Sequence, residues 1–103
     1  MHHTEEEGIC LKNAKELELE IEKFYKKVGE NVKKKREEKK FTQLQLSHLL
    51  GFKSVGLVSQ SELYLKKQHF NLKHLFLIAS ILECSLQDFF EDVEVPRNMK
   101  IDL

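Results

Sequence analysis

Residues 42–62 read TQLQLSHLLGFKSVGLVSQSE, and this stretch predicts two short helices separated by a turn. Thr42 and Gln45 can form a capping box, in which each side chain accepts a hydrogen bond from the backbone N–H of the other. Three leucines then follow on one face of the first helix. Gly51 ends that helix, because glycine readily takes the left-handed conformation found at helix C-termini. The second helix is predicted over Ser54–Leu65, and a polar loop follows it.

Upstream of this stretch, one long helix or two shorter helices are predicted between Asn13 and Lys40. Asn13, with Glu16 three residues later, can cap the first turn. Gly29 is the one weak point, since glycine costs about 1 kcal/mol relative to alanine inside a helix. A stripe of apolar residues at helical spacing runs along this segment: Ala14, Leu17, Ile21, Phe24 and Val28. The stripe packs either on the domain itself or on a partner, and we favour the domain.

Downstream, two further helices are predicted. Asn71 is a favourable N-cap residue for the first of them. Ser85 and Asp88 can form a capping box for the second, which is short. The core residues expected from these two helices are Leu72, Leu75, Ile78, Ala79, Leu82, Leu86, Phe89 and Phe90. The chain after Glu91 is polar and is expected to be loosely held.

The composition fits one small all-α domain. The chain has 103 residues, of which 41% are hydrophobic and 33% charged, which suits a modest core under a highly charged surface. Four Gly and one Pro are too few for the many turns of an all-β fold. No apolar run approaches the roughly 20 residues of a membrane-spanning helix, and the start MHHTEEEG does not resemble a signal peptide. Two cysteines are too few for a disulfide framework, so we expect a soluble, cytoplasmic protein.

Charge is sorted along the chain, although the formal net charge is zero. Residues 1–22 hold seven Glu and two Lys, whereas residues 23–74 hold thirteen Lys or Arg and four Glu. Residues 75–103 hold six acidic and two basic residues. A basic middle between acidic ends can attract a polyanion to one part of the surface. A solvated helix face gives the same pattern, so the charge alone does not identify a partner.

The segments VGENVKKKREEKKFTQLQLSHLLGF, VSQSE and NLKHLFLIASILECSLQDFF together resemble the Cro and phage-repressor type (Xre family) of helix-turn-helix DNA-binding domains. The closing pattern from Leu72 to Phe89 is the most specific part of the resemblance. The resemblance implies an all-α fold with a five-helix repressor-type helix-turn-helix domain at residues 28–90. Residues 1–27 would then form an acidic, amphipathic N-terminal helical extension, and residues 91–103 a polar C-terminal tail.

The resemblance also implies structural roles for single residues. Arg36 would form an ion pair with Glu62, which ties the first helix to the end of the recognition helix and fixes geometry more than it adds stability. Ser47 would lie where two helices cross closely. Lys35 stands where the family usually has an apolar residue, and we expect it to be exposed. Leu44 stands where the family usually has a charged residue, so we expect the N-terminal helix to cover it.

The implied DNA contacts are of two kinds. Lys40, Gln43, Lys66 and Lys67 would bind phosphates, Gln43 from the positive end of its helix. Counting back from Glu62 places Val55, Gly56 and Leu57 at the base-reading positions, where none can form a bidentate hydrogen bond with a base. The spacing from Gly51 to Glu62 is one residue longer than the family's. Either Lys53, Ser54 and Gln60 face the groove, or reading depends on apolar thymine contacts and DNA shape, or sequence reading has been lost. The full candidate set is Lys40, Thr42, Gln43, Lys53, Ser54, Val55, Gly56, Leu57, Gln60, Lys66 and Lys67.

The resemblance implies a transcriptional regulator, most simply a repressor that binds double-stranded DNA as a homodimer. One alternative is a DNA-binding antitoxin that also captures a protein toxin through its acidic end or N-terminal helix. A second is a helix-turn-helix fold reused as a protein interaction module, in keeping with the apolar base-reading positions. The sequence has no catalytic arrangement, so we expect no enzymatic activity, no cofactor and no membrane partner. His69 and His74, five residues apart with no third ligand nearby, are not expected to bind a metal.

Overall fold

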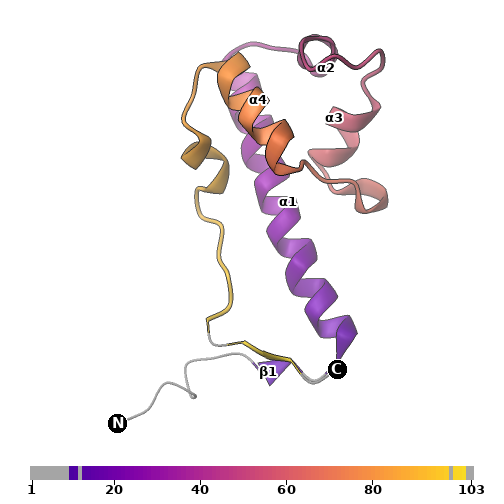
Figure 1. Ribbon diagram of the computed structural model, residues 1–103, viewed down its shortest axis with the longest axis vertical. Helices are drawn as coiled ribbons and strands as arrows, with labels where there is room; N and C mark the ends of the chain where they lie inside the picture. Colours follow the sequence, from indigo (N-terminus) through magenta and orange to yellow (C-terminus); the bar gives the residue numbers. More distant parts are fainter. Residues whose placement is uncertain (1–9, 12, 98, 102–103) are drawn as a thin grey trace.

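The structure, a computed structural model, describes residues 10–11, 13–97 and 99–101 (Figure 1). The remaining residues of the N-terminal extension and C-terminal tail, at 1–9, 12, 98 and 102–103, lie outside the described residues. The elements in chain order are β1 (Cys10–Leu11), α1 (Ala14–Glu38), α2 (Gln43–Leu49), α3 (Gly56–Ser61), the 3-10 helix η2 (Leu65–Lys67), α4 (Leu72–Leu82), the 3-10 helix η3 (Leu86–Phe90) and β2 (Lys100–Ile101). The body of the fold is helical, which confirms the all-α class. The two strands pair in parallel, Cys10 with Lys100 and Leu11 with Ile101.

α1 is one continuous helix that extends well beyond the other helices (Figure 1). The side chain of Asn13 caps it by accepting a 2.9 Å hydrogen bond from the N–H of Glu16. The helix passes through Gly29 without a break, so the single long helix is the alternative found. Burial increases along it, from the half-buried Phe24 to the buried Val28. The first part of α1 therefore projects from the helical body, and the segment after η3 returns beside it toward β2 (Figure 1).

The core forms where α1 to α4 and η3 meet. Asn31 of α1 is buried, and its amide donates hydrogen bonds of 2.9 and 2.8 Å to the backbone carbonyls of Phe89 and Glu91. Because unpaired buried carbonyls cost free energy, this one polar side chain stabilises the junction of α1 with η3. The buried hydrophobic residues are Val28, Val32, Leu46, Val58, Phe70, Leu75, Ile78, Ala79, Leu82 and Phe89.

Four predictions of burial are wrong. Leu72 is 76% exposed, because it lies in the first turn of α4, where no other described element covers it, and Leu86 of η3 is also exposed. Leu44 is 47% exposed, because the projecting part of α1 leads away from α2 and does not cover it. Lys35 is half-buried rather than exposed, since its ammonium group lies 3.8 Å from the Asp88 carboxylate of η3.

Two predicted helices also differ in the structure. The helix expected over residues 54–65 is limited to α3, because the chain enters the left-handed region at Tyr64, with φ of 56°. The expected loop at 66–70 therefore begins inside η2. The last predicted helix forms as the 3-10 helix η3, opened by a hydrogen bond from the N–H of Ser85 to the Asp88 carboxylate. The described residues thus contain four α-helices and two 3-10 helices.

Candidate nucleic-acid interface

α2 begins with the capping box that the sequence predicts. The N–H of Gln45 donates to Oγ1 of Thr42 over 3.0 Å, and the N–H of Thr42 donates to Oε1 of Gln45 over 2.8 Å. α2 ends before Gly51, which takes a φ of 93°, in the left-handed region that glycine enters without steric cost. The chain then turns into the segment that leads to α3, and α2 and α3 lie in contact.

α3 approaches α1 more closely than any side chain at Gly29 would allow. A Cβ atom on Gly29 would lie 2.8 Å from the carbonyl oxygen of Glu62 and would also collide with that of Ser61. Because both obstacles are backbone atoms, neither can swing aside. Gly29, which from sequence is only a weak point of the helix, therefore sets the distance between α1 and the end of α3. The hydroxyl groups of Ser61 and of Ser47, the expected crossing residue, are buried without a hydrogen-bond partner among the described residues.

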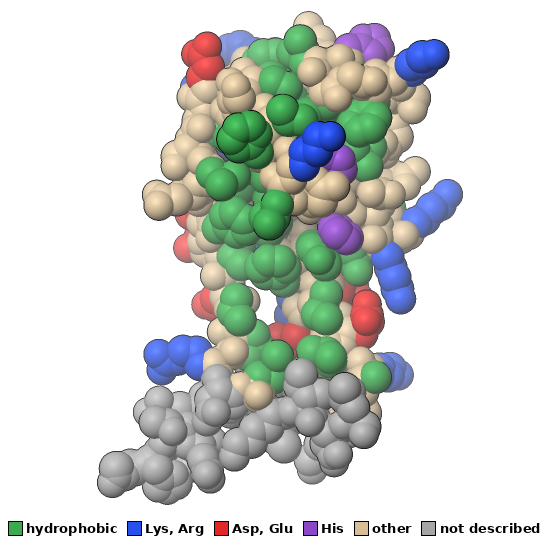
Figure 2. Space-filling view, in the orientation of Figure 1, with side chains coloured by type: hydrophobic (Ala, Val, Ile, Leu, Met, Phe, Trp, Pro, Cys, Tyr) green, Lys and Arg blue, Asp and Glu red, His purple; other side chains and the backbone are tan. Residues whose placement is uncertain are grey.

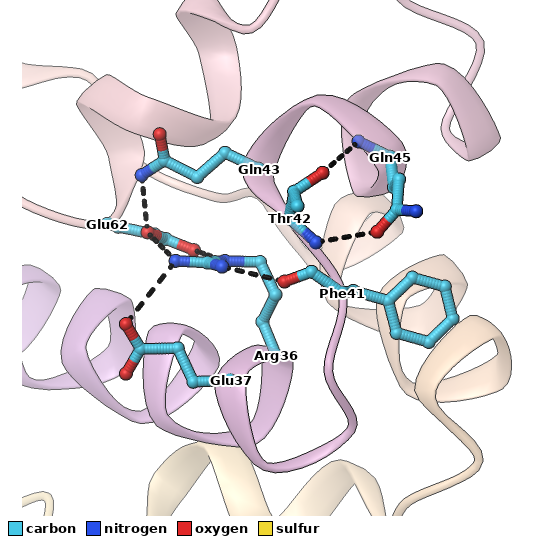
Figure 3. A network of polar contacts seen from close by, with 7 residues as sticks. All are labelled: Arg36, Glu37, Phe41, Thr42, Gln43, Gln45 and Glu62. Carbon is cyan, nitrogen blue, oxygen red and sulfur yellow. Dashed lines mark hydrogen bonds and ion pairs between the residues drawn. The ribbon is translucent and has the colours of Figure 1, made fainter.

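Arg36 and Glu62 form the ion pair that the resemblance implies (Figure 3). Nε of Arg36 lies 2.7 Å from Oε2 of Glu62, and Nη2 lies 3.1 Å from Oε1, so the contact is bidentate. The remaining nitrogen, Nη1, donates to the carbonyl of Phe41 over 2.8 Å. The arginine side chain is 7% exposed and the glutamate side chain 0%. The pair thereby joins the end of α1, the start of α2 and the end of α3.

Gln43 belongs to the same network. Its Nε2 donates a 2.9 Å hydrogen bond to Oε1 of Glu62, so the Glu62 carboxylate accepts from both α1 and α2 (Figure 3). Glu37 approaches the network from the solvent side, with its Oε2 3.9 Å from Nη2 of Arg36. The amide group that the resemblance assigns to a phosphate is therefore bound within the protein.

The candidate base-reading residues lie between Lys53 and Gln60, from the turn before α3 to near its end. Lys53 and Ser54 precede the helix and are exposed. The other four residues lie in or next to α3 and are half-buried: Val55, Gly56, Leu57 and Gln60. Of the hydrogen-bonding set, Lys53 and Ser54 therefore lie in the turn and Gln60 near the end of α3, while the apolar set lies at the first helical turn.

An aromatic stack holds the segment after Glu62. Tyr25 of α1 stacks on His69, with ring centroids 3.9 Å apart, and on Tyr64, with centroids 5.5 Å apart. Tyr64, Lys66 and Lys67 have φ of 56°, 56° and 60°. Left-handed conformations cost about 1–2 kcal/mol per non-glycine residue, so the surrounding contacts must fix them. The stack supplies such contacts and positions the backbone of the two lysines.

The lysines expected to bind phosphate are all exposed. Lys40 follows the C-terminus of α1, and Lys66 and Lys67 follow α3. The ammonium group of Lys67 lies 3.9 Å from the carboxylate of Glu18 on α1, but both side chains are at least half exposed. Such an exposed pair contributes little free energy, so the ammonium group remains available to another anion.

Sequence reasoning missed the contacts that fix this surface from behind. Tyr25, Asn31 and the steric role of Gly29 did not enter the predicted core or site. The available signal was Tyr64, a large aromatic residue where the resembled family usually has a small loop residue. An aromatic side chain in an otherwise polar loop needs a partner, and Tyr25 is that partner.

His74 connects the site to the cap of α4. Its Nδ1 accepts a 3.1 Å hydrogen bond from the N–H of Asn71, while its own N–H donates to the side chain of Asn71 over 2.7 Å. Desolvation by burial, and then the charges of Lys73 and His69, lower the pKa of His74. The neutral imidazole is therefore the form that caps the helix.

Comparisons of the chain with protein families, with curated proteins and with solved structures found no match. Within the described residues, no helix is long and apolar enough to cross a membrane. In the same part of the chain, no three His, Cys, Asp or Glu side chains are grouped to hold a metal ion.

Proposed function

We propose that this protein is a DNA-binding transcriptional regulator, a repressor that reads a short operator half-site with a helix-turn-helix formed by α2 and α3. The observation that carries the proposal is the network of Arg36, Glu62 and Gln43, which fixes both helices on α1 from behind. A recognition helix discriminates between bases only when its position is fixed to within a fraction of an ångström. A buried ion pair adds little net stability, so its value here lies in holding α3 in position.

The exposed positive charge supports the same function. Lys53 precedes α3, Lys66 and Lys67 follow it, and Lys40 lies before α2. In this arrangement the recognition helix enters the major groove while lysines on both sides bind the flanking phosphates. A single half-site is short, so the regulator acts as a homodimer on a near-palindromic operator.

One observation favours a second candidate, a protein interaction module. Leu44 and Leu49 of α2 are 47% and 58% exposed, and Leu63, just after α3, is 52% exposed. Large apolar side chains exposed on the surface can mark protein interaction sites. In this reading the same rigid pair of helices presents a leucine-rich surface to another protein.

Titration of fluorescent duplex DNA over a series of salt concentrations separates the two candidates. If a dimer neutralises roughly ten phosphates, the logarithm of the affinity falls with the logarithm of salt concentration with a slope of about −9. A slope shallower than about −3 means that the protein neutralises few phosphates and that the lysines are only a solvated surface. That result contradicts the proposal.

The double variant Lys66→Ala/Lys67→Ala should weaken binding to all duplexes alike, because phosphate contacts carry no sequence information. The matched control is Lys15→Ala/Lys23→Ala, which removes the same charge from exposed positions in the projecting part of α1. Equal weakening by both double variants would indicate a general effect of net charge, and it would mean that Lys66 and Lys67 do not contact the DNA.

A further inference from the structure

α4 exposes two large apolar side chains, although its solvent-facing side also carries Lys73 and Ser80. Its inner side buries Leu75, Ile78 and Leu82. On its outer side Leu72 and Phe76, four residues apart and therefore on one face, are 76% and 68% exposed. Large apolar side chains that remain exposed next to one another can mark a contact with another molecule. The outer side of α4 therefore lacks a partner within the described chain.

A hollow lies beside Leu72. It has a volume of about 280 Å³ and lies between α1 and the start of α4, with Leu72 on its rim and Phe24, Val28, Leu75 and Phe90 among its walls. A second groove of about 390 Å³ continues from it along the projecting part of α1, lined by residues of α1 and of the C-terminal segment. Figure 2 shows hydrophobic side chains gathered on this face, over α4 and along α1.

We propose that this face binds a second copy of the chain across a two-fold axis, with Phe76 of each copy inserted into the hollow of the other. A two-fold interface uses the same patch on both copies, so one face must carry both the protrusion and the cavity that receives it. Leu72 and Phe76 are the protrusion, and the adjoining hollow is the cavity. This assigns the dimer contact of the proposed regulator and in that respect rests on the proposed function.

Charge complementarity favours a second copy in the antiparallel orientation. Residues 14–24, in the projecting part of α1, hold four Glu and two Lys, whereas residues 33–40, at its other end, hold six Lys or Arg and two Glu. The molecule is elongated, with extents of 51 × 27 × 19 Å, so these ends lie far apart. An antiparallel pair places the acidic end of each copy beside the basic end of the other. Such complementarity orients the partners and disfavours the parallel arrangement.

The exposed apolar side chains supply the centre of such an interface. A phenylalanine side chain has roughly 150–250 Å² of surface, so Phe76 at 68% exposure leaves more than about 100 Å² in water. Leu72 and the walls of both hollows add to this apolar centre. A standard interface buries about 800 Å² on each partner, with an apolar core and a charged rim, and the acidic and basic ends of α1 supply that rim.

Docking on this face reaches the aromatic stack. Tyr25 and His69 line the hollow, and they stack with each other and with Tyr64. The inserted Phe76 would therefore touch the groups that position the backbone of Lys66 and Lys67. α2 and α3 lie to one side of α4 (Figure 1), so the second copy does not cover them.

Sedimentation of the full-length protein without DNA, from about 1 to 300 µM, tests the inference. The wild type should form dimers, and Phe76→Ser should weaken association by at least about 30-fold, as expected for an aromatic anchor. Its melting temperature at a concentration where both proteins are monomeric should be unchanged, because Phe76 is exposed. Leu19→Ser, which removes a half-exposed apolar side chain of α1 that lines neither hollow, is the control and should associate as the wild type does.

A wild type that stays monomeric throughout this range overturns the inference, and so does a Phe76→Ser variant that associates as strongly as the wild type. The outcome is separable from that of the proposed function. A dimer that Phe76→Ser disrupts but that binds no duplex contradicts the DNA function alone. A wild type that is monomeric in solution yet binds duplex with steep salt dependence contradicts the dimer face alone.

Discussion

Replacing Glu62 by glutamine removes one charge from the centre of the network and keeps the size of the side chain. The Glu62 carboxylate accepts two hydrogen bonds from Arg36 and one from Gln43, and it is fully buried. In Glu62→Gln an NH2 group must face at least one of these donors. The guanidinium group of Arg36 keeps its charge in a site where its side chain is only 7% exposed. Removing one partner of a buried ion pair in this way costs about 3–5 kcal/mol.

That loss is large for a chain of this size, whose total stability is about 5–15 kcal/mol. Each kcal/mol shifts the melting temperature of a domain of this size by about 4–8 °C. The melting temperature of Glu62→Gln, followed by circular dichroism at 222 nm, should therefore fall by at least about 12 °C. Urea denaturation at 25 °C should give the same loss as a free energy of unfolding.

Glu37→Gln is the matched control, because it changes the other carboxylate near the same guanidinium group. Glu37 lies 3.9 Å from Arg36, and its side chain is 59% exposed. An exposed partner at that distance contributes about 0.5 kcal/mol or less. If Glu62→Gln and Glu37→Gln melt within about 3 °C of each other, the buried pair does not hold α3, and the argument for a rigid recognition helix fails.

Two further outcomes follow from local geometry. Gly29→Ala should lower the free energy of unfolding by about 1–3 kcal/mol, although alanine has the better helix propensity, because the added methyl group meets the Ser61 carbonyl. Gly56→Ala is the control and should not lower it, since a Cβ atom there meets no atom closer than 3.8 Å. Because the pKa of His74 is lowered by folding, its contribution to stability is present above the unfolded pKa of about 6.5 and is lost as pH falls below it. His74→Gln can still accept the hydrogen bond from Asn71. Measured by urea denaturation, its free energy of unfolding should therefore fall less than that of the wild type between about pH 7.5 and 5. An equal loss would contradict the role of the neutral His74 as a cap.

Local interactions were the most predictable part of the fold. The capping residues Asn13, Thr42 and Asn71 each act on a backbone group three residues away. Such contacts depend only on neighbouring residues in the sequence, so residue type and spacing suffice to predict them. The helical stripe of α1 was predictable for the same reason, although its burial decreases toward the N-terminus.

The contacts between distant segments were much less predictable. The stack of Tyr25 on His69 joins residues that no periodicity relates. Asn31 is buried because two carbonyls at the end of η3 point at it, and a rule that equates burial with apolarity passes over such a residue. Leu72 shows the opposite error, since helical spacing places it in the buried stripe but says nothing about where the core ends.

The contact between Arg36 and Glu62 is the exception, and it has a consequence for the register of α3. The chain from Val55 to Glu62 is continuously helical in its hydrogen bonds, with the N–H of Ser59 donating to Val55 and the N–H of Glu62 donating to Val58. Residues 55–62 therefore form one helical segment that includes both Val55 and Glu62. The count from Glu62 back to Val55, which assigned the base-reading positions, therefore stays within this one segment. The first turn of the segment is apolar. If the proposed function holds, hydrogen bonds to base edges come from Lys53 and Ser54 before α3 or from Gln60 near its end, while the first turn of α3 contributes shape and apolar contact.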